Sequence, residues 1–196
     1  MSRAADLCTG LRVVLAPLLA WSFALSRAHP TWMPFVVYVV AAASDYVDGI
    51  VARAAGTASR RGRVFDHCAD ALLLFPSFVV LAHRQSLPTL LPLAAMTAFA
   101  LYVVDGWRRG GGLGAMDLTG SRSGALGGVL NYGIAGAAAG AYALAAPGID
   151  RAVYLVAFPI AAVNALAAYE RFALLLTSAR GSLAVEREAR ASRSSP

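Results

Sequence analysis

The hydrophobic residues of this chain are gathered into six long runs, separated by short polar or glycine- and proline-rich breaks. A helix needs about 20 mainly apolar residues to cross a bilayer. The sequence therefore predicts six transmembrane helices, over residues 11–25, 31–54, 66–82, 87–107, 124–146 and 151–178.

The composition is typical of an integral membrane protein. Of the 196 residues, 58% are hydrophobic and 14% are charged, and the mean hydropathy is +0.60. In soluble domains about a quarter of the residues are charged. We expect an all-α integral membrane protein, with residues 1–178 forming a six-helix membrane domain and residues 179–196 forming a basic polar tail.

The arginines set the orientation of the predicted helices. The loops on one side hold three of them, Arg27, Arg84 and Arg151, whereas the termini and the loops on the other side hold twelve. Positive residues gather on the cytoplasmic side of membrane proteins, so both termini are predicted to be cytoplasmic. The twelve are Arg3, Arg53, Arg60, Arg61, Arg63, Arg108, Arg109, Arg122, Arg180, Arg187, Arg190 and Arg193.

Four of the eight aspartates lie close to this cytoplasmic face. Asp45 and Asp48 are three residues apart near the end of the second predicted span, and Asp66 and Asp70 are four apart at the start of the third. Both spacings place a pair on one face of a helix. The connection from residue 54 to residue 65 contains glycines and can fold back, so we expect the four carboxylates to converge.

Converging carboxylates repel one another, and an aspartate within a bilayer is costly to bury. Two divalent cations would neutralise four carboxylates, and oxygen ligands suit Mg²⁺ or Mn²⁺. Three other interpretations stay open from the charges alone. The aspartates can pair with the arginines at positions 53–63, face water as a solvated loop, or relay protons in a transporter.

The spacing of the acidic segment carries a resemblance. The chain has Asp45-x-x-Asp48-Gly49-x-x-Ala52-Arg53, then eight residues, then Gly62-x-x-x-Asp66-x-x-x-Asp70. This is similar to the signature of the CDP-alcohol phosphotransferase family, D-x-x-D-G-x-x-A-R-x8-G-x-x-x-D-x-x-x-D, and all eight fixed positions match. The length and the number of predicted spans also suit that family along the whole chain.

The resemblance implies a membrane enzyme of phospholipid synthesis. Such an enzyme moves a substituted phosphate from a CDP-linked donor, in bacteria usually CDP-diacylglycerol, to an alcohol and releases CMP. It implies a two-metal site for Mg²⁺ or Mn²⁺, with Asp45, Asp48 and Asp66 as ligands. It also implies that Asp70 acts as the base toward the acceptor hydroxyl and as a further ligand.

The same resemblance implies where the nucleotide binds. Asp48, Gly49, Ala52, Arg53 and Gly62 match the nucleotide-binding positions, where small residues let the nucleotide approach the backbone and the arginine can fork onto phosphate. Helix packing is the alternative role of the small residues. Members are typically homodimers, and the expected location is the bacterial inner (cytoplasmic) membrane, with the site facing the cytoplasm and no nucleic acid as a partner.

The class of acceptor alcohol is predicted from three arginines that flank one loop. Arg108, Arg109 and Arg122 flank the cytoplasmic loop between the fourth and fifth spans and are candidates to hold a phosphorylated acceptor, glycerol 3-phosphate or inositol phosphate. Anchoring by the positive-inside rule explains these arginines as well. The sequence Asp66-His-Cys-Ala-Asp70-Ala departs from the D-P-x-A-D-K that phosphatidylglycerophosphate synthases of the family commonly have.

A weaker similarity lies upstream, where Leu7-Cys-Thr9-Gly-Leu-Arg12 resembles the L-x-T-x-x-R of the family's first span. Arg12 is equally explained as an arginine that snorkels from a helix end.

Two functions outside the family compete with the one that the resemblance implies. A prenyltransferase also binds diphosphate through aspartates, but usually has about nine spans. A transporter would distribute its acidic residues through the membrane depth.

Overall fold

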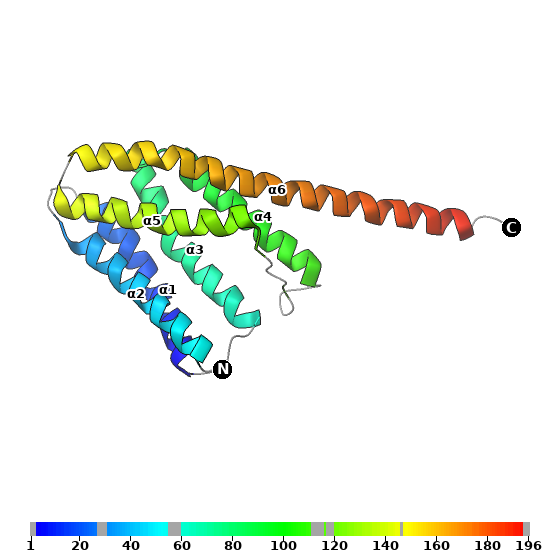
Figure 1. Ribbon diagram of the computed structural model, residues 1–196, viewed down its shortest axis with the longest axis horizontal. Helices are drawn as coiled ribbons and strands as arrows, with labels where there is room; N and C mark the ends of the chain where they lie inside the picture. The colour runs from blue at the N-terminus through cyan, green and yellow to red at the C-terminus, as the bar shows by residue number, and fades with distance from the viewer. Residues whose placement is uncertain are drawn as a thin grey trace.

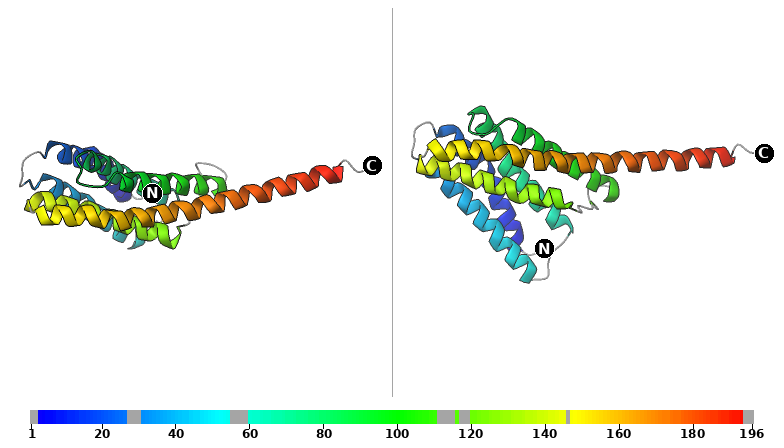
Figure 2. Two further views of the ribbon diagram at one scale, coloured as in Figure 1. Left: turned by 90° about the horizontal axis from the view of Figure 1, so that it is seen from above. Right: turned by 45° about the horizontal axis from the view of Figure 1, so that its top comes forward.

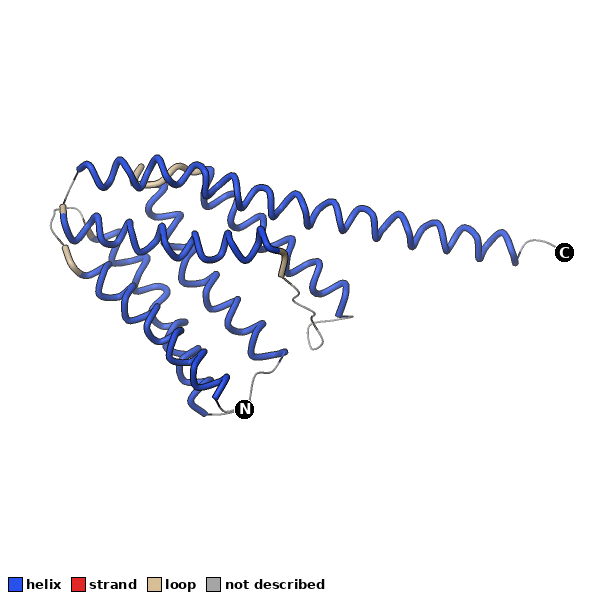
Figure 3. The backbone as a smooth tube through the Cα atoms, viewed as in Figure 1, coloured by secondary structure: helices blue, strands red, loops and turns tan. Residues whose placement is uncertain are grey.

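The computed structural model describes residues 3–26, 31–54, 60–110, 116, 120–145 and 147–193, and nearly all of them are helical (Figures 1 and 3). The expected all-α class is confirmed. The six helices are α1 (Arg3–Leu25), α2 (Met33–Ala54), α3 (Arg60–His83), α4 (Leu90–Gly110), α5 (Arg122–Leu144) and α6 (Pro147–Arg193).

Three helical stretches of the described chain are long and apolar enough to cross a membrane, namely Val64–His83, Leu90–Gly110 and Gly148–Ser178. Two shorter apolar helices, Gly10–Leu25 and Met33–Val47, accompany them. The remaining helix, α5, is rich in glycine and alanine, which add less hydropathy than leucine or valine. The chain is a helical membrane protein.

The helices pack as a closed ring. Around it, α1 contacts α2, α2 contacts α5, α5 contacts α6, α6 contacts α4, α4 contacts α3, and α3 returns to α1. Figure 2 shows the bundle from two further sides. The ring encloses a core of large buried side chains, among them Leu19, Phe23, Leu73, Phe78 and Leu91. Many other large apolar side chains point outward, as expected where lipid replaces water.

The helices are held together at the end of the bundle where α1 and α3 stop. There Nη1 of Arg84, which follows α3, donates hydrogen bonds to the carbonyl oxygens of Phe23, Ala24 and Ser26 at distances of 2.6–3.1 Å. These carbonyls lie at the carboxyl end of α1, where helix carbonyls lack partners and carry partial negative charge. Toward the opposite end the helices fan apart in Figure 1, and the aspartate-bearing ends of α2 and α3 lie there.

Several helix boundaries differ from the prediction, most of all the start of α1, which is Arg3 rather than residue 11, the start of α3 and the end of α6. The third helix begins at Arg60 rather than at residue 66. Both halves of the signature therefore lie on helices, and only residues 55–59 separate the end of α2 from the start of α3. The search for apolar runs missed this turn because three of its first four residues are arginines. The backbone of α6 likewise continues as helix to Arg193, beyond the bundle (Figure 1), and the domain boundary at residue 178 stays a prediction.

A close contact joins α2 to α5 beside the site described below. The hydroxyl of Tyr38 donates a hydrogen bond to the backbone carbonyl of Tyr132 at 2.8 Å. The Tyr38 ring crosses α5 at Gly136, where an added Cβ would lie 2.7 Å from the nearest ring atom. Such a distance is far below a normal contact, so only glycine leaves room for this ring.

We therefore expect Gly136→Ala to destabilise the protein by about 1–3 kcal/mol, the usual cost of overpacking, because the Tyr38 ring must move and give up its hydrogen bond. Gly133→Ala is the matched control, since an added Cβ there meets nothing within 4 Å. The apparent melting temperature in detergent should fall for Gly136→Ala and stay near wild type for Gly133→Ala. Equal melting of both variants would contradict the packing described here.

Candidate active site

The guanidinium group of Arg12 lies at the centre of the acidic cluster. Its Nη1 lies 2.9 Å from Oδ1 of Asp45 and 2.7 Å from Oδ1 of Asp70, and its Nη2 lies 3.2 Å from Oδ1 of Asp66. Three helices supply these groups, because α1 packs against both α2 and α3. The predicted convergence of these three aspartates is thus present in the structure, and an arginine holds it together.

The burial of Arg12 excludes the snorkelling interpretation. Its side chain is 0% exposed, whereas those of Asp45, Asp66 and Asp70 are 44%, 42% and 26% exposed. The arginine therefore forms the floor of the cluster, and the carboxylates remain accessible from the other side. Three carboxylates and one guanidinium sum to a charge of −2, which attracts a cation to that open side.

The other signature residues fall differently. Gly62 is half-buried in the first turn of α3. The side chains of Asp48, Gly49, Ala52 and Arg53 lie outside the described residues, although the α2 backbone continues through them to Ala54. The predicted pairing of the aspartates with the arginines at positions 53–63 also falls on side chains outside the described part.

The donor set suits a divalent cation. Carboxylate oxygens are the ligands that Mg²⁺ and Mn²⁺ prefer, and Asp45, Asp66 and Asp70 surround one point. Within the described part of the chain, no three acidic, histidine or cysteine side chains are already spaced as a metal site, because the guanidinium of Arg12 lies between the carboxylates. The chemistry and the charge of −2 fit a cation, with Arg12 remaining as the inner counterion.

Asp70 also faces a cavity of about 590 Å³ between α3, α4, α5 and α6. Leu74, Phe75 and Phe99 line its apolar part, and Asp70, Tyr132 and Arg171 are among its polar groups. The volume lies within the range of small-molecule sites. The acidic cluster and the cavity therefore share Asp70, so a molecule in the cavity can reach that carboxylate.

Two arginines share one carboxylate beside this cavity, and one of them, Arg171, lines it. Oδ2 of Asp105 on α4 lies 2.5 Å from Nη1 of Arg171 and 2.6 Å from Nη2 of Arg109. Arg171 is nearly buried, and its guanidinium also lies over the ring of Tyr102, 5.4 Å from the centroid. One carboxylate and two guanidiniums sum to +1, so this end of the cavity favours an anionic group.

The structure places the three arginines predicted for the acceptor as follows. Arg109 belongs to the Asp105 cluster, Arg108 and Arg122 are exposed, and none of the three is among the residues that line the cavity. Arg171, which falls within the last predicted span (residues 151–178), lines it. Arg171 was not predicted as a site residue because its partner Asp105 is 66 residues away, and spacing along one helix cannot reveal such a pair.

Polar contacts between α5 and α6 fix the far wall of the cavity. Asn131 and Asn164 exchange two side-chain hydrogen bonds, of 3.1 and 3.0 Å, and both are buried. Ser123 at the start of α5 donates a hydrogen bond to Glu170 of α6. Buried amides that satisfy each other hold two helices in a defined register, which keeps Arg171 and Tyr132 facing the same space.

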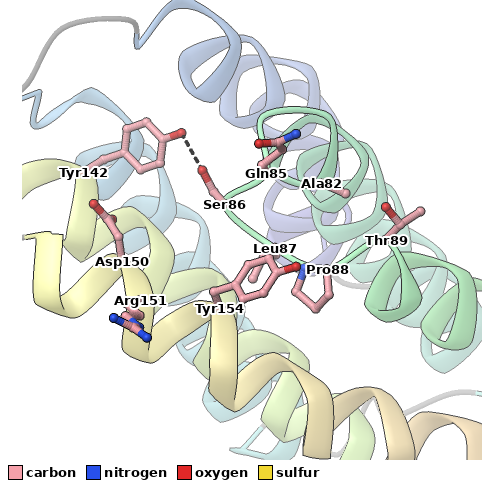
Figure 4. Close-up of a pocket in the computed structure, with 10 residues that line it drawn as sticks. All are labelled: Ala82, Gln85, Ser86, Leu87, Pro88, Thr89, Tyr142, Asp150, Arg151 and Tyr154. Atoms are coloured by element: carbon pink, nitrogen blue, oxygen red, sulfur yellow. Dashed lines mark hydrogen bonds between the residues drawn. The ribbon is translucent and has the colours of Figure 1, made fainter.

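A second cavity, of about 820 Å³, lies at the end of the bundle that Arg84 holds together (Figure 4). The loop after α3 and the adjoining ends of α5 and α6 line it, and the hydroxyls of Ser86 and Tyr142 lie 3.2 Å apart at its edge. It contains none of the predicted site residues. Its hydrogen-bonded tyrosine nevertheless offers a useful comparison with Tyr132, which lies on the same helix.

The family model of the CDP-alcohol phosphatidyltransferases matches residues 3–177, which include every helix that contributes to the acidic cluster and the cavity. The chain belongs to the CDP-alcohol phosphatidyltransferase family. The resemblance inferred from the eight signature positions is thereby confirmed. The chain is an enzyme of this family, whose members use divalent metal, in agreement with the carboxylate cluster around Arg12.

Curated relatives of this CDP-alcohol phosphatidyltransferase family member carry a more specific name. The CDP-diacylglycerol--glycerol-3-phosphate 3-phosphatidyltransferases of Escherichia coli (strain K12), Shigella flexneri serotype 5b (strain 8401) and Shigella sonnei (strain Ss046) are each 35% identical to it over 96 residues. That match covers 47% of this chain and 51% of each relative. The chain thus spans about half the length of the curated relatives it matches.

Proposed function

We propose that this protein transfers a phosphatidyl group from CDP-diacylglycerol to the hydroxyl of a polar alcohol and releases CMP. The observation that carries the proposal is the position of Asp70, which belongs to the carboxylate cluster around Arg12 and also lines the cavity. A donor bound at the cluster and an alcohol bound in the cavity would meet at this residue. Membership of the family supports the same reaction class.

The chemistry divides among the residues of the site. Asp45, Asp48, Asp66 and Asp70 would hold two divalent cations, and bound cations would neutralise the charge of the diphosphate. Asp70 would accept the proton of the acceptor hydroxyl. The hydroxyl oxygen then bonds to the phosphatidyl phosphorus, the bond from that phosphorus to CMP breaks, and CMP departs with the electron pair.

Binding of the nucleotide is proposed for the turn that follows Asp48. Gly49 and Ala52 on α2 and Gly62 on α3 would give the cytidine and its phosphates close access to the backbone. Arg53 would form forked hydrogen bonds to phosphate oxygens. Residues 49, 52 and 53 lie on the same helix as Asp45, and this supports a nucleotide bound beside the cluster.

The acceptor is proposed to carry a phosphate. Arg171 lines the cavity and belongs to a cluster with Asp105 and Arg109 whose summed charge is +1, and forked hydrogen bonds from arginine suit a phosphate. Arg108 and Arg122 would add positive charge at the entrance. Glycerol 3-phosphate is favoured, because relatives that are 35% identical over about half their length are named for it, and inositol phosphate is the other candidate of this chemistry.

The site is proposed to face the cytoplasm, in the inner membrane of a bacterium. All six helices would span, both termini would be cytoplasmic, and residues 179–196 would form a basic tail. The unequal distribution of arginines supports this orientation. The position of the cavity supports it too, since Asp70 of the carboxylate cluster and Arg171 of α6 both line it. A homodimer is proposed from the family resemblance alone.

The test is a transfer assay with the full chain in lipid nanodiscs. We expect CMP release from cytidine-labelled CDP-diacylglycerol with Mg²⁺ and glycerol 3-phosphate, and less with serine, inositol phosphate or phosphatidylglycerol. Arg171→Ala should raise the acceptor KM about 10- to 100-fold, as expected for one charged hydrogen-bonding partner, and leave the donor KM unchanged. Leu155→Ala, an exposed residue of α6, is the control.

The outcomes separate the alternatives. Turnover with an uncharged alcohol and none with either phosphorylated one would overturn the acceptor proposal and leave the transferase intact. Absence of CMP release with every acceptor would overturn the transferase itself. Ion flux through the protein, or transfer of a prenyl group from a prenyl diphosphate, would then favour the transporter or the prenyltransferase.

A further inference from the structure

A tyrosine from outside the signature contacts the proposed base. The hydroxyl of Tyr132, on α5, donates a hydrogen bond of 2.5 Å to Oδ1 of Asp70. Nη1 of Arg12 donates to the same oxygen at 2.7 Å. Both contacts therefore fall on one of the two carboxylate oxygens, and in the described part of the chain the other oxygen, Oδ2, carries neither a hydrogen bond nor an ion pair.

The arrangement matters because the final torsion of an aspartate is soft. Rotation of a carboxylate about its sp³–sp² bond has a broad profile, so packing alone does not decide which oxygen points where. Two donors from different helices, α1 and α5, hold Oδ1 from two directions. The carboxylate plane is thereby fixed by contacts to Oδ1, at a residue that lines the cavity together with Tyr132.

The backbone of Tyr132 is fixed by a contact with α2. Tyr38 donates a hydrogen bond to its backbone carbonyl at 2.8 Å, and the Tyr38 ring is packed against Gly136, one turn further along α5. The backbone of α5 is thus fixed relative to α2 at the residue that contacts Asp70. A side chain anchored in this way can serve as a geometric reference for the carboxylate.

We infer that Tyr132 is the positioning residue of the proposed base: it fixes Oδ1 of Asp70 and so orients Oδ2 to accept the proton of the acceptor hydroxyl. This role rests on the proposed function. In the transfer step, the proton passes to Oδ2, the acceptor oxygen bonds to phosphorus and CMP leaves. The hydroxyl of Tyr132 neither gains nor loses a proton, so it acts through Asp70 and touches no reacting atom.

The experiment compares two tyrosines of the same helix. Tyr132→Phe removes the hydroxyl that contacts Asp70, and Tyr142→Phe removes one that lies 3.2 Å from that of Ser86 at the other end of α5. With CDP-diacylglycerol and glycerol 3-phosphate, we expect kcat to fall about tenfold in Tyr132→Phe, the scale of one hydrogen bond to a charged group. The donor KM and the kcat of Tyr142→Phe should match wild type.

A double-mutant cycle with Asp70→Asn separates positioning from general stability. If Tyr132 acts through Asp70, adding Tyr132→Phe to Asp70→Asn should cause no further loss of kcat. Equal losses in both backgrounds would overturn the inference. So would wild-type kcat in Tyr132→Phe, or joint loss of activity and melting temperature in that variant alone. Failure of the wild-type protein to release CMP would instead count against the proposed function.

Discussion

Replacing Asp66 with asparagine is expected to abolish CMP release while the protein remains folded. Asp66 shares the guanidinium of Arg12 with Asp45 and Asp70, and the open side of this cluster, with its charge of −2, is where a divalent cation would bind. Losing one carboxylate ligand should lower kcat by about a thousandfold or more, because charge neutralisation provides most of the catalysis in phosphoryl transfer.

Binding of Mg²⁺ tests the role of Asp66 without relying on turnover. Mg²⁺ should raise the apparent melting temperature of the wild-type protein, since a ligand that binds only the folded state stabilises it, and should raise that of Asp66→Asn much less. Asp150→Asn is the matched control, because Asp150 lines the second cavity at the opposite end. Full turnover in excess chelator would rule out a metal-dependent site.

Replacing Arg12 with alanine is expected to have the second large effect, on stability. Arg12 is fully buried beneath three carboxylates, and its removal leaves them facing one another without an internal cation. Breaking a fully buried ion pair costs about 3–5 kcal/mol. Because the aspartates are 26–44% exposed, water screens part of the repulsion, and we expect a loss of about 2 kcal/mol.

The dependence on added cation distinguishes this effect from ordinary loss of packing. Mg²⁺ should recover much of the lost melting temperature in Arg12→Ala, since it supplies the missing positive charge from the open side. Arg12→Lys keeps one charge but loses the fork that reaches both Asp45 and Asp66, so its stability should be intermediate. Arg151→Ala, at an exposed arginine of α6, is the control. An Arg12→Ala protein that melts like wild type in chelator would contradict the role of Arg12.

The sequence revealed those parts of the site that depend on local spacing. Asp66 and Asp70 are one helical turn apart, and eight positions around them match a family signature, so the cluster and the family were both predictable. The turn of α3 from Arg60 was not. This segment is helical but polar, and an apolar run ends where the hydropathy falls.

The contacts that complete the site join residues far apart in the chain. Arg12 is 58 residues from Asp70, Tyr132 is 62 residues from it, and Arg171 is 66 residues from Asp105. Each pair depends on which helices are neighbours in the ring. Apolar periodicity indicates that a helix has a buried face, but it does not identify the helix that packs against that face. Arg12 and Arg171 were visible as arginines inside spans, but their partners were not.

The closed ring has a consequence for how such an enzyme can diversify. The carboxylate cluster belongs to α1, α2 and α3, which are consecutive in the chain, whereas α4, α5 and α6 supply most of the cavity wall. On the proposed roles, the first half of the gene encodes the handling of the donor and the second half encodes the choice of alcohol. Drift or recombination confined to the second half can therefore produce lineages with new lipid products, while the inherited reaction remains the same.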